Sequence, residues 1–359
     1  MLQLLPLLWT VSRALPENHL LAMIGWLGEL VVASFLLSYG AEHLSAKYGS
    51  RFIGRTLMSV ATTFPEIAIV VYAAADGFYG TAMGAGLGSN LLMMTLGLAL
   101  MLLIATTRLS KSPLKGINVT GFKLDKVFLL LSAITGALLF VNGYDLLDGL
   151  VFSGLFFAYI VFAFREMRNE RLQARPENKS EPNAKAGTLA PSPNRILVAT
   201  LIFTLGTVGV FFGAQPFIAS LEGLAADSGV SVVALAVIVS PIAGEMPEKL
   251  SMMILARKGE AGASIAIANV LGSKILNNTL LLAVLVFGAV NHAGFSATIA
   301  PTPILNYQVI LVTAVTVIAL LPMFRKEIGR KTGIGLTAMY CASLFLQFLL
   351  PHEATAGSP

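Results

Sequence analysis

The stretch ATTFPEIAIV, residues Ala61 to Val70, places a proline beside a carboxylate inside an otherwise apolar run. A second stretch, AGEMPEKLSM from Ala243 to Met252, repeats the Pro-Glu pair in another apolar run. Proline removes a helical hydrogen bond, and a carboxylate is unfavourable in hydrocarbon. Two copies of such a pair indicate a function that both copies share.

The composition around these stretches is that of an integral membrane protein. Of the 359 residues, 56% are hydrophobic and 12% are charged, and the mean hydropathy is +0.79. Apolar runs of about 20 residues recur, which is the length that crosses a bilayer as a helix. We predict an all-α integral membrane protein with about ten transmembrane helices, near residues 20–44, 52–75, 80–106, 124–142, 148–164, 196–220, 230–256, 262–290, 305–323 and 333–350.

The basic residues are concentrated in alternate loops between these helices. Of the 24 lysines and arginines, all but Arg13, Lys249 and Lys274 lie in the first, third, fifth, seventh and ninth loops. The positive-inside rule makes these loops cytoplasmic and places both termini outside, most simply in a bacterial inner membrane. The net charge of +5 therefore indicates membrane topology, and we expect no nucleic-acid partner.

The fifth loop divides the chain. Residues 167–194 are rich in charged residues, Pro, Ser and Asn, which predicts a flexible cytoplasmic linker between a first half at 1–166 and a second half at 195–350. Residues 351–359 are expected to form a disordered tail. Because each half holds five helices, an odd number, the halves enter the membrane in opposite senses. The sequence thus predicts two inverted five-helix repeats, an architecture typical of secondary transporters.

A second element follows each Pro-Glu pair. The first is GTAMGAGLGSNLLMM, from Gly80 to Met94, and the second is GASIAIANVLGSKILNN, from Gly262 to Asn278. Their small residues allow close helix packing, which brings the hydroxyls of Ser89 and Ser273 near the carboxylates. The prolines leave backbone carbonyls without helical partners, and such oxygens are suitable ligands for a hard cation.

These two blocks resemble the alpha repeats of the calcium/cation antiporter superfamily, which includes the sodium/calcium exchangers. The resemblance covers an alpha-1 repeat at about 52–106 and an alpha-2 repeat at about 230–290, within a similar topology over nearly the whole chain. It implies that Glu66 and Glu248 bind the metal cation, assisted by other oxygen donors. The implied ion-binding set is Glu66, Glu248, Thr62, Thr63, Ser89, Ser273, Gly244, Glu245 and Asn277.

Three positions depart from the family pattern. Gly244 and Glu245 stand where the first repeat has its two threonines, so the second repeat offers a backbone carbonyl and a third carboxylate instead. Met93 stands four residues after Ser89, where the family usually has an oxygen ligand. A thioether is a poor ligand for calcium or sodium, so one ligand is lost.

Two lysines lie inside predicted helices close to these blocks. Lys249 directly follows Glu248, and Lys274 matches Asn90 of the first repeat. Lys274 either pairs with Glu245, which leaves the other two glutamates for cations, or its ammonium acts as a built-in substitute ion. Lys249 either pairs within the site or extends its ammonium toward the membrane surface.

We predict a secondary-active cation antiporter that works by alternating access and carries Ca²⁺, Na⁺ or H⁺ as substrates, without a cofactor. A proton-coupled or monovalent cation exchanger of the same fold is an alternative, and a non-transporting membrane scaffold is an alternative of a different class. The sequence contains no nucleophile-base arrangement, phosphate-binding loop or metal-ligand spacing of His and Cys, so we do not expect an enzyme. The expected partners are small cations and lipid, and the oligomeric state stays open.

Overall fold

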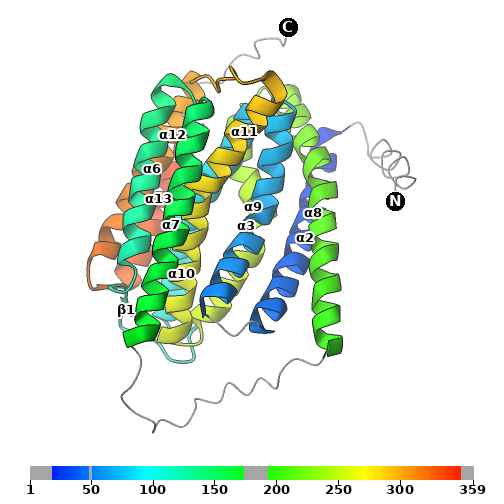
Figure 1. Cartoon of the computed structure of the whole chain (residues 1–359). Helices are drawn as coiled ribbons and strands as arrows, with labels where there is room; N and C mark the ends of the chain where they lie inside the picture. The colour runs from blue at the N-terminus through cyan, green and yellow to red at the C-terminus, as the bar shows by residue number, and fades with distance from the viewer. Residues whose placement is uncertain (1–17, 48–50, 174–192, 349–359) are drawn as a thin grey trace.

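The computed structural model describes residues 18–47, 51–173 and 193–348. Most of the predicted linker and all of the predicted tail at 351–359 lie outside the described residues. Figure 1 shows a bundle of long helices that run roughly along one direction. The end of α7 and the beginning of α8, which flank the central segment, lie at its lower end in that view.

The elements follow one another in two similar series. Before the central segment these are α2 (His19–Lys47), α3 (Arg51–Ala75), α4 (Tyr79–Leu92), the π-helical turn η1 (Met93–Gly97), α5 (Leu98–Ala105), β1 (Ile117–Asn118), α6 (Lys123–Leu139), η2 (Phe140–Asn142) and α7 (Leu146–Gln173). After it these are α8 (Pro193–Ser228), α9 (Val232–Ala256), α10 (Glu260–Leu276), the π-helical turn η3 (Asn277–Leu281), α11 (Leu282–Ala293), α12 (Pro303–Leu320), η4 (Leu321–Phe324), β2 (Glu327–Ile328) and α13 (Arg330–Phe348).

Seven helical segments within the described residues are long and apolar enough to cross a membrane. They are His19–Ala41, Tyr79–Ala105, Lys123–Asn142, Leu146–Glu166, Ile196–Ser228, Glu260–Ala293 and Pro303–Phe324. The helix α9 is outside this set because it carries Glu245, Glu248 and Lys249, all of them buried. The prediction of an all-α membrane protein is thus confirmed, whereas the count of ten crossings stays a prediction.

Small residues bring α4 against α9. Gly80, Gly84 and Gly88 share one face of α4, and a Cβ atom built on any of them would press on α9. At Gly88 that Cβ would meet the carbonyl oxygen of Val237, which is the oxygen that Pro241 leaves without a helical donor. The close approach fixes the position of the residues that follow Gly88 relative to α9.

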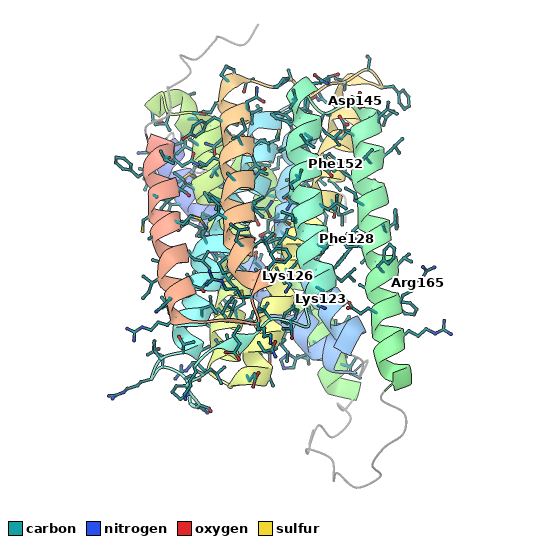
Figure 2. The ribbon with its side chains drawn as sticks, turned by 90° about the vertical axis from the view of Figure 1, so that its left-hand side faces the viewer. Lys123, Lys126, Phe128, Asp145, Phe152 and Arg165 are labelled. Carbon is teal, nitrogen blue, oxygen red and sulfur yellow. The ribbon has the colours of Figure 1, made fainter. Side chains whose placement is uncertain are left out.

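Two connections between α-helices tie the lower end of the bundle together. The strand β1 pairs with β2 in antiparallel register, with Ile117 opposite Ile328. Beside them the buried ammonium of Lys126 donates to the carbonyl oxygens of Val119 and Met323, each at 2.8 Å. Figure 2 shows Lys126 in the lower half of the bundle and Asp145 at the opposite end.

Candidate functional site

The two Pro-Glu pairs lie inside continuous helices near the middle of the bundle. Pro65 and Glu66 belong to α3, and Pro247 and Glu248 belong to α9. The helices that follow them, α4 and α10, each continue into a π-helical turn. The first turn begins four residues after Ser89 and the second begins four residues after Ser273. π-Helical turns occur mostly as single insertions in α-helices, and they are frequent at functional sites. Neither turn has a signal in the sequence that distinguishes it from ordinary helix.

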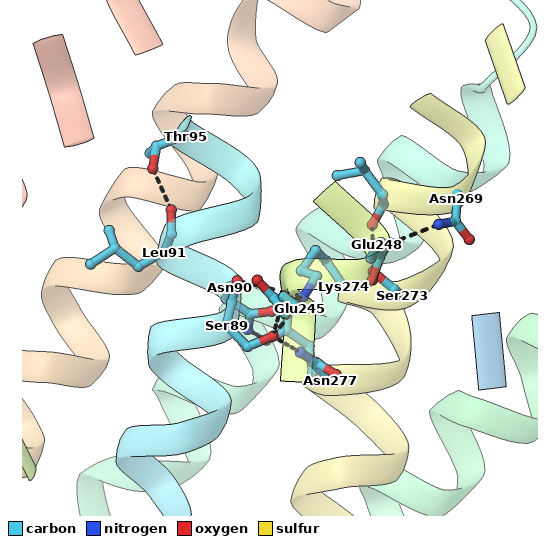
Figure 3. Close-up of polar contacts among 12 residues, drawn as sticks. Ser89, Asn90, Leu91, Thr95, Glu245, Glu248, Asn269, Ser273, Lys274 and Asn277 are labelled. Atoms are coloured by element: carbon cyan, nitrogen blue, oxygen red, sulfur yellow. Dashed lines mark hydrogen bonds and ion pairs between the residues drawn. The ribbon is translucent and has the colours of Figure 1, made fainter. Parts of the chain in front are cut away.

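Glu248 is held by two donors from α10. Its Oε1 accepts a hydrogen bond from Asn269 Nδ2 at 3.0 Å and another from Ser273 Oγ at 3.1 Å, as Figure 3 shows. The side chain is buried, with 2% of the residue exposed. Asn269, Ser273 and Asn277 follow one another at intervals of four residues, so a single stripe of α10 and η3 supplies the polar groups.

Glu66 has no such donors. Both of its carboxylate oxygens are buried and accept no hydrogen bond from the described part of the protein, and the hydroxyl of Thr63 one turn earlier is also unpartnered. Thr62 is buried beside them. A Cβ atom on Gly244 would collide with the Glu66 carboxylate, so this carboxylate lies directly against the backbone of α9. The absence of a side chain at residue 244 is therefore what makes room for Glu66.

Ser89 is the centre of a network that joins α4 to the second half. Its hydroxyl donates to Glu245 Oε1 and accepts from Lys274 Nζ and from Asn277 Nδ2, each of the latter at 2.6 Å. Lys274 also forms an ion pair with Glu245, and both side chains are almost fully buried. The sequence predicts that the hydroxyls of Ser89 and Ser273 lie near the two Pro-Glu carboxylates. The carboxylate to which the Ser89 hydroxyl hydrogen-bonds is that of Glu245 (Figure 3).

One carbonyl oxygen that a proline leaves without a helical donor accepts a hydrogen bond from another helix. Pro247 cannot donate to the carbonyl oxygen of Ala243, and the hydroxyl of Ser34 on α2 donates to it at 3.1 Å. This hydrogen bond uses one of the two lone pairs of that oxygen, so its use as a cation ligand stays a prediction. Ser34 is a contact that the sequence does not reveal, because nothing in it shows which helix packs beside Pro247.

Other buried polar side chains lie on the same helices. Lys249 is buried but forms no ion pair with any described residue. Asn90 donates to Asn278 Oδ1 at 2.6 Å, which adds a second polar contact between α4 and η3. Within residues 18–47, 51–173 and 193–348, no three side chains of His, Cys, Asp or Glu are grouped to hold a metal ion. Oxygen donors for a cation would therefore have to combine carboxylates with hydroxyls, amides and carbonyls.

The unpartnered oxygens indicate what the site is suited to bind. Glu66 contributes two of them, and one each comes from Glu245 Oε2, Asn277 Oδ1 and Asn90 Oδ1. Buried acceptors without donors are unfavourable, and a small cation satisfies several of them at once. Membrane-buried carboxylates where proline-containing helices meet are the arrangement of a membrane ion antiporter.

Comparison with known proteins identifies the family. The profile of the sodium/calcium exchanger protein family matches residues 19–165 and 198–349, and the chain belongs to that family. The crystal structure of the H⁺/Ca²⁺ exchanger CAX superposes with a TM-score of 0.77 and 21% identity, over 97% of this chain and 86% of that chain.

Two further proteins are also similar to most of this chain. A structure of the sodium-calcium exchanger NCX_Mj has a TM-score of 0.59 and 23% identity, over 90% of this chain and 98% of that chain. Inner membrane protein YrbG of Escherichia coli strain K12 is 23% identical over 334 residues, which are 89% of this chain and 96% of YrbG. At these identities the solved structures establish the shared fold.

Proposed function

We propose that the protein is a secondary-active cation antiporter in which Glu66 and Glu248 bind the exchanged cations in competition. The observation that carries this proposal is the Glu66 carboxylate, whose two buried oxygens lack any donor from the described residues. A carboxylate in that state requires either a proton or a cation. Both are the cargo of an antiporter, so the same group serves the exchanged ions in turn.

The other oxygen donors belong to the same proposal. Ser273 already contacts Glu248, and Thr63 offers an unpartnered hydroxyl beside Glu66. Thr62 and the carbonyl oxygen of Gly244 complete the set on the two proline-containing helices. Hydroxyl and carbonyl oxygens are the ligands that Na⁺ and Ca²⁺ prefer, and both ions accept mixed shells of this kind.

The architecture of the transport cycle is also part of the proposal. Ten crossings in two inverted halves, 1–166 and 195–350, place Glu66 and Glu248 on helices of opposite sense near the membrane midplane. Alternating access then follows when α2 and α8, which pack against each other, move together over the site. In this arrangement the termini face outward, and the linker at 167–194 faces the cytoplasm of a bacterial cell.

A proton-coupled exchanger is the second candidate. Met93 removes one oxygen ligand and Lys274 adds a positive charge, and both changes disfavour a site that must hold several sodium ions at once. The fold of the H⁺/Ca²⁺ exchanger CAX, with its TM-score of 0.77, is compatible with this alternative.

Uptake of radiolabelled calcium into proteoliposomes of the purified protein tests both candidates. An outward sodium gradient and an outward proton gradient are imposed in turn, and uptake under only one of them identifies the coupling ion. Glu66→Gln and Glu248→Gln are each expected to abolish uptake, whereas Glu260→Gln, at an exposed carboxylate at the start of α10, is expected to retain it. Retained uptake in both site variants would remove the site assignment.

A further inference from the structure

The ammonium group of Lys274 has the surroundings of a bound metal cation. Its Nζ contacts a carboxylate oxygen of Glu245, the hydroxyl oxygen of Ser89 at 2.6 Å and the backbone carbonyl oxygen of Ser89 at 3.5 Å. An ammonium has three N–H donors and no acceptor, so three oxygens satisfy it fully. Carboxylate, hydroxyl and carbonyl oxygens are also the donors that a hard cation such as Na⁺ takes.

The position of this ammonium is internal to the site. Lys274 is 1% exposed, and its contacts connect α4 of the first half with α9 and α10 of the second. A lysine that only balances charge in a membrane helix usually extends to the interface, where its ammonium stays hydrated. Lys274 instead reaches inward to the point where the two halves meet (Figure 3).

The charge balance follows from this contact. The ion pair joins Lys274 and Glu245 with almost no solvent access, so Glu245 is neutralised by a group that cannot leave. Glu66 and Glu248 are not paired to a cation within the described residues. Lys249 is buried on the same helix as Glu248 but forms no ion pair there, so it does not replace a mobile ion in direct contact.

We propose that Lys274 is a tethered cation that permanently fills one cation position of the exchange site. The protein then binds its transported ions only at Glu66 and Glu248. Because the ammonium fills the oxygen cage around Ser89 and Glu245, the site holds one sodium ion fewer than it would hold without this lysine. This inference rests on the proposed antiport function and specifies its ion count. Glu245 and Ser89 thereby become ligands of the tether, and not of the cargo.

Replacing the tether tests the inference through binding instead of transport. Lys274→Asn, which introduces the residue found at the matching Asn90, leaves the cage open with its carboxylate in place. Thermal unfolding of the purified full chain is followed at pH 8 while NaCl replaces choline chloride at constant ionic strength. Above the dissociation constant, each additional bound sodium raises the folded-to-unfolded ratio about tenfold for a tenfold rise in sodium.

The expected result is a steeper sodium dependence in Lys274→Asn than in the unmodified protein, by about one ion in the logarithmic slope. The double variant Lys274→Asn/Glu245→Gln removes both charges and is expected to return to the original slope. Should Lys274→Asn fail to fold in choline, refolding in sodium or ammonium chloride supports the tether as well. Three results would overturn the tether. They are a slope in Lys274→Asn equal to that of the unmodified protein, a slope in the double variant as steep as that of Lys274→Asn, and no folding of Lys274→Asn in any of these salts.

Failure of the proposed function gives a different signature. If Glu66→Gln and Glu248→Gln both retained calcium uptake, the antiport site would be wrong whatever the slope. If those variants lost uptake while Lys274→Asn kept the original slope, the site would stand and only the tether would be refuted.

Discussion

Gly244→Ala is the substitution by which the packing of the site is most directly tested. In a helix interior this change is ordinarily stabilising, by about 0.5–1 kcal/mol, because alanine has less backbone freedom to lose on folding than glycine. Here the added Cβ would meet both an oxygen and the carboxyl carbon of Glu66. Because the backbone of α9 cannot yield easily, the carboxylate must move, and overpacking of this kind destabilises by about 1–3 kcal/mol.

The sign of the effect depends on Glu66. In a Glu66→Ala background the carboxylate is gone, so Gly244→Ala is expected to recover its ordinary stabilising effect. The two measurements then differ by a coupling free energy of about 1.5–4 kcal/mol, obtained by adding the overpacking and helix contributions. The lower part of this range overlaps the coupling of about 0.5–3 kcal/mol known for residues in direct contact.

The assay is a double-mutant cycle on the free energy of unfolding. The four proteins are the unmodified chain, each single variant and the double variant, unfolded by titration with sodium dodecyl sulfate in mixed micelles. Circular dichroism reports the loss of helix. If Gly244→Ala destabilises equally with and without Glu66, the collision with the carboxylate is not its cause, and the placement of Glu66 against α9 is wrong.

Three further predictions use the same unfolding measurement. Gly88→Ala is expected to destabilise by about 1–3 kcal/mol because its Cβ meets a backbone carbonyl of α9, whereas Gly86→Ala meets only the flexible end of a leucine and should change stability far less; equal effects would contradict the close packing. Ser34→Ala leaves the Ala243 carbonyl without a donor and should destabilise by about 1–2 kcal/mol, and no loss of stability would show that water replaces the hydroxyl. Lys126→Met removes the buried ammonium and leaves two backbone carbonyl oxygens without their donor, so it should destabilise by about 2–3 kcal/mol. Lys123→Met, one turn earlier, is expected to cause no change because the Lys123 side chain is exposed.

The helices were largely predictable from apolar run length. The predicted span 80–106 corresponds to observed helix at 79–105, and 230–256 corresponds to 232–256. The helix α8 continues to Ser228, beyond the predicted end at residue 220, although Glu222 follows. The Glu222 carboxylate accepts a hydrogen bond from Thr81 on α4. This tertiary contact stabilises the carboxylate, and no local sequence pattern predicts it.

The charged part of the site was more accessible to sequence reasoning than its hydroxyls and amides. A carboxylate partner lowers the cost of a lysine inside a membrane helix, so the pairing of Lys274 with Glu245 was among the arrangements that the residues allow. The contact of Asn269 with Glu248 was missed, although Asn269 lies one helical turn before Ser273 on the same face. That spacing was the signal available for finding it.

The ion pair between Lys274 and Glu245 also constrains the evolution of the sequence. The two residues are 29 positions apart, yet a lineage that lost either one alone would strand a buried charge between its helices. They therefore behave as a single inherited character, gained or lost together or through an uncharged intermediate. Among homologues, a lysine at this position should be accompanied by an acidic residue at the other, and a homologue with the lysine alone would count against the pair.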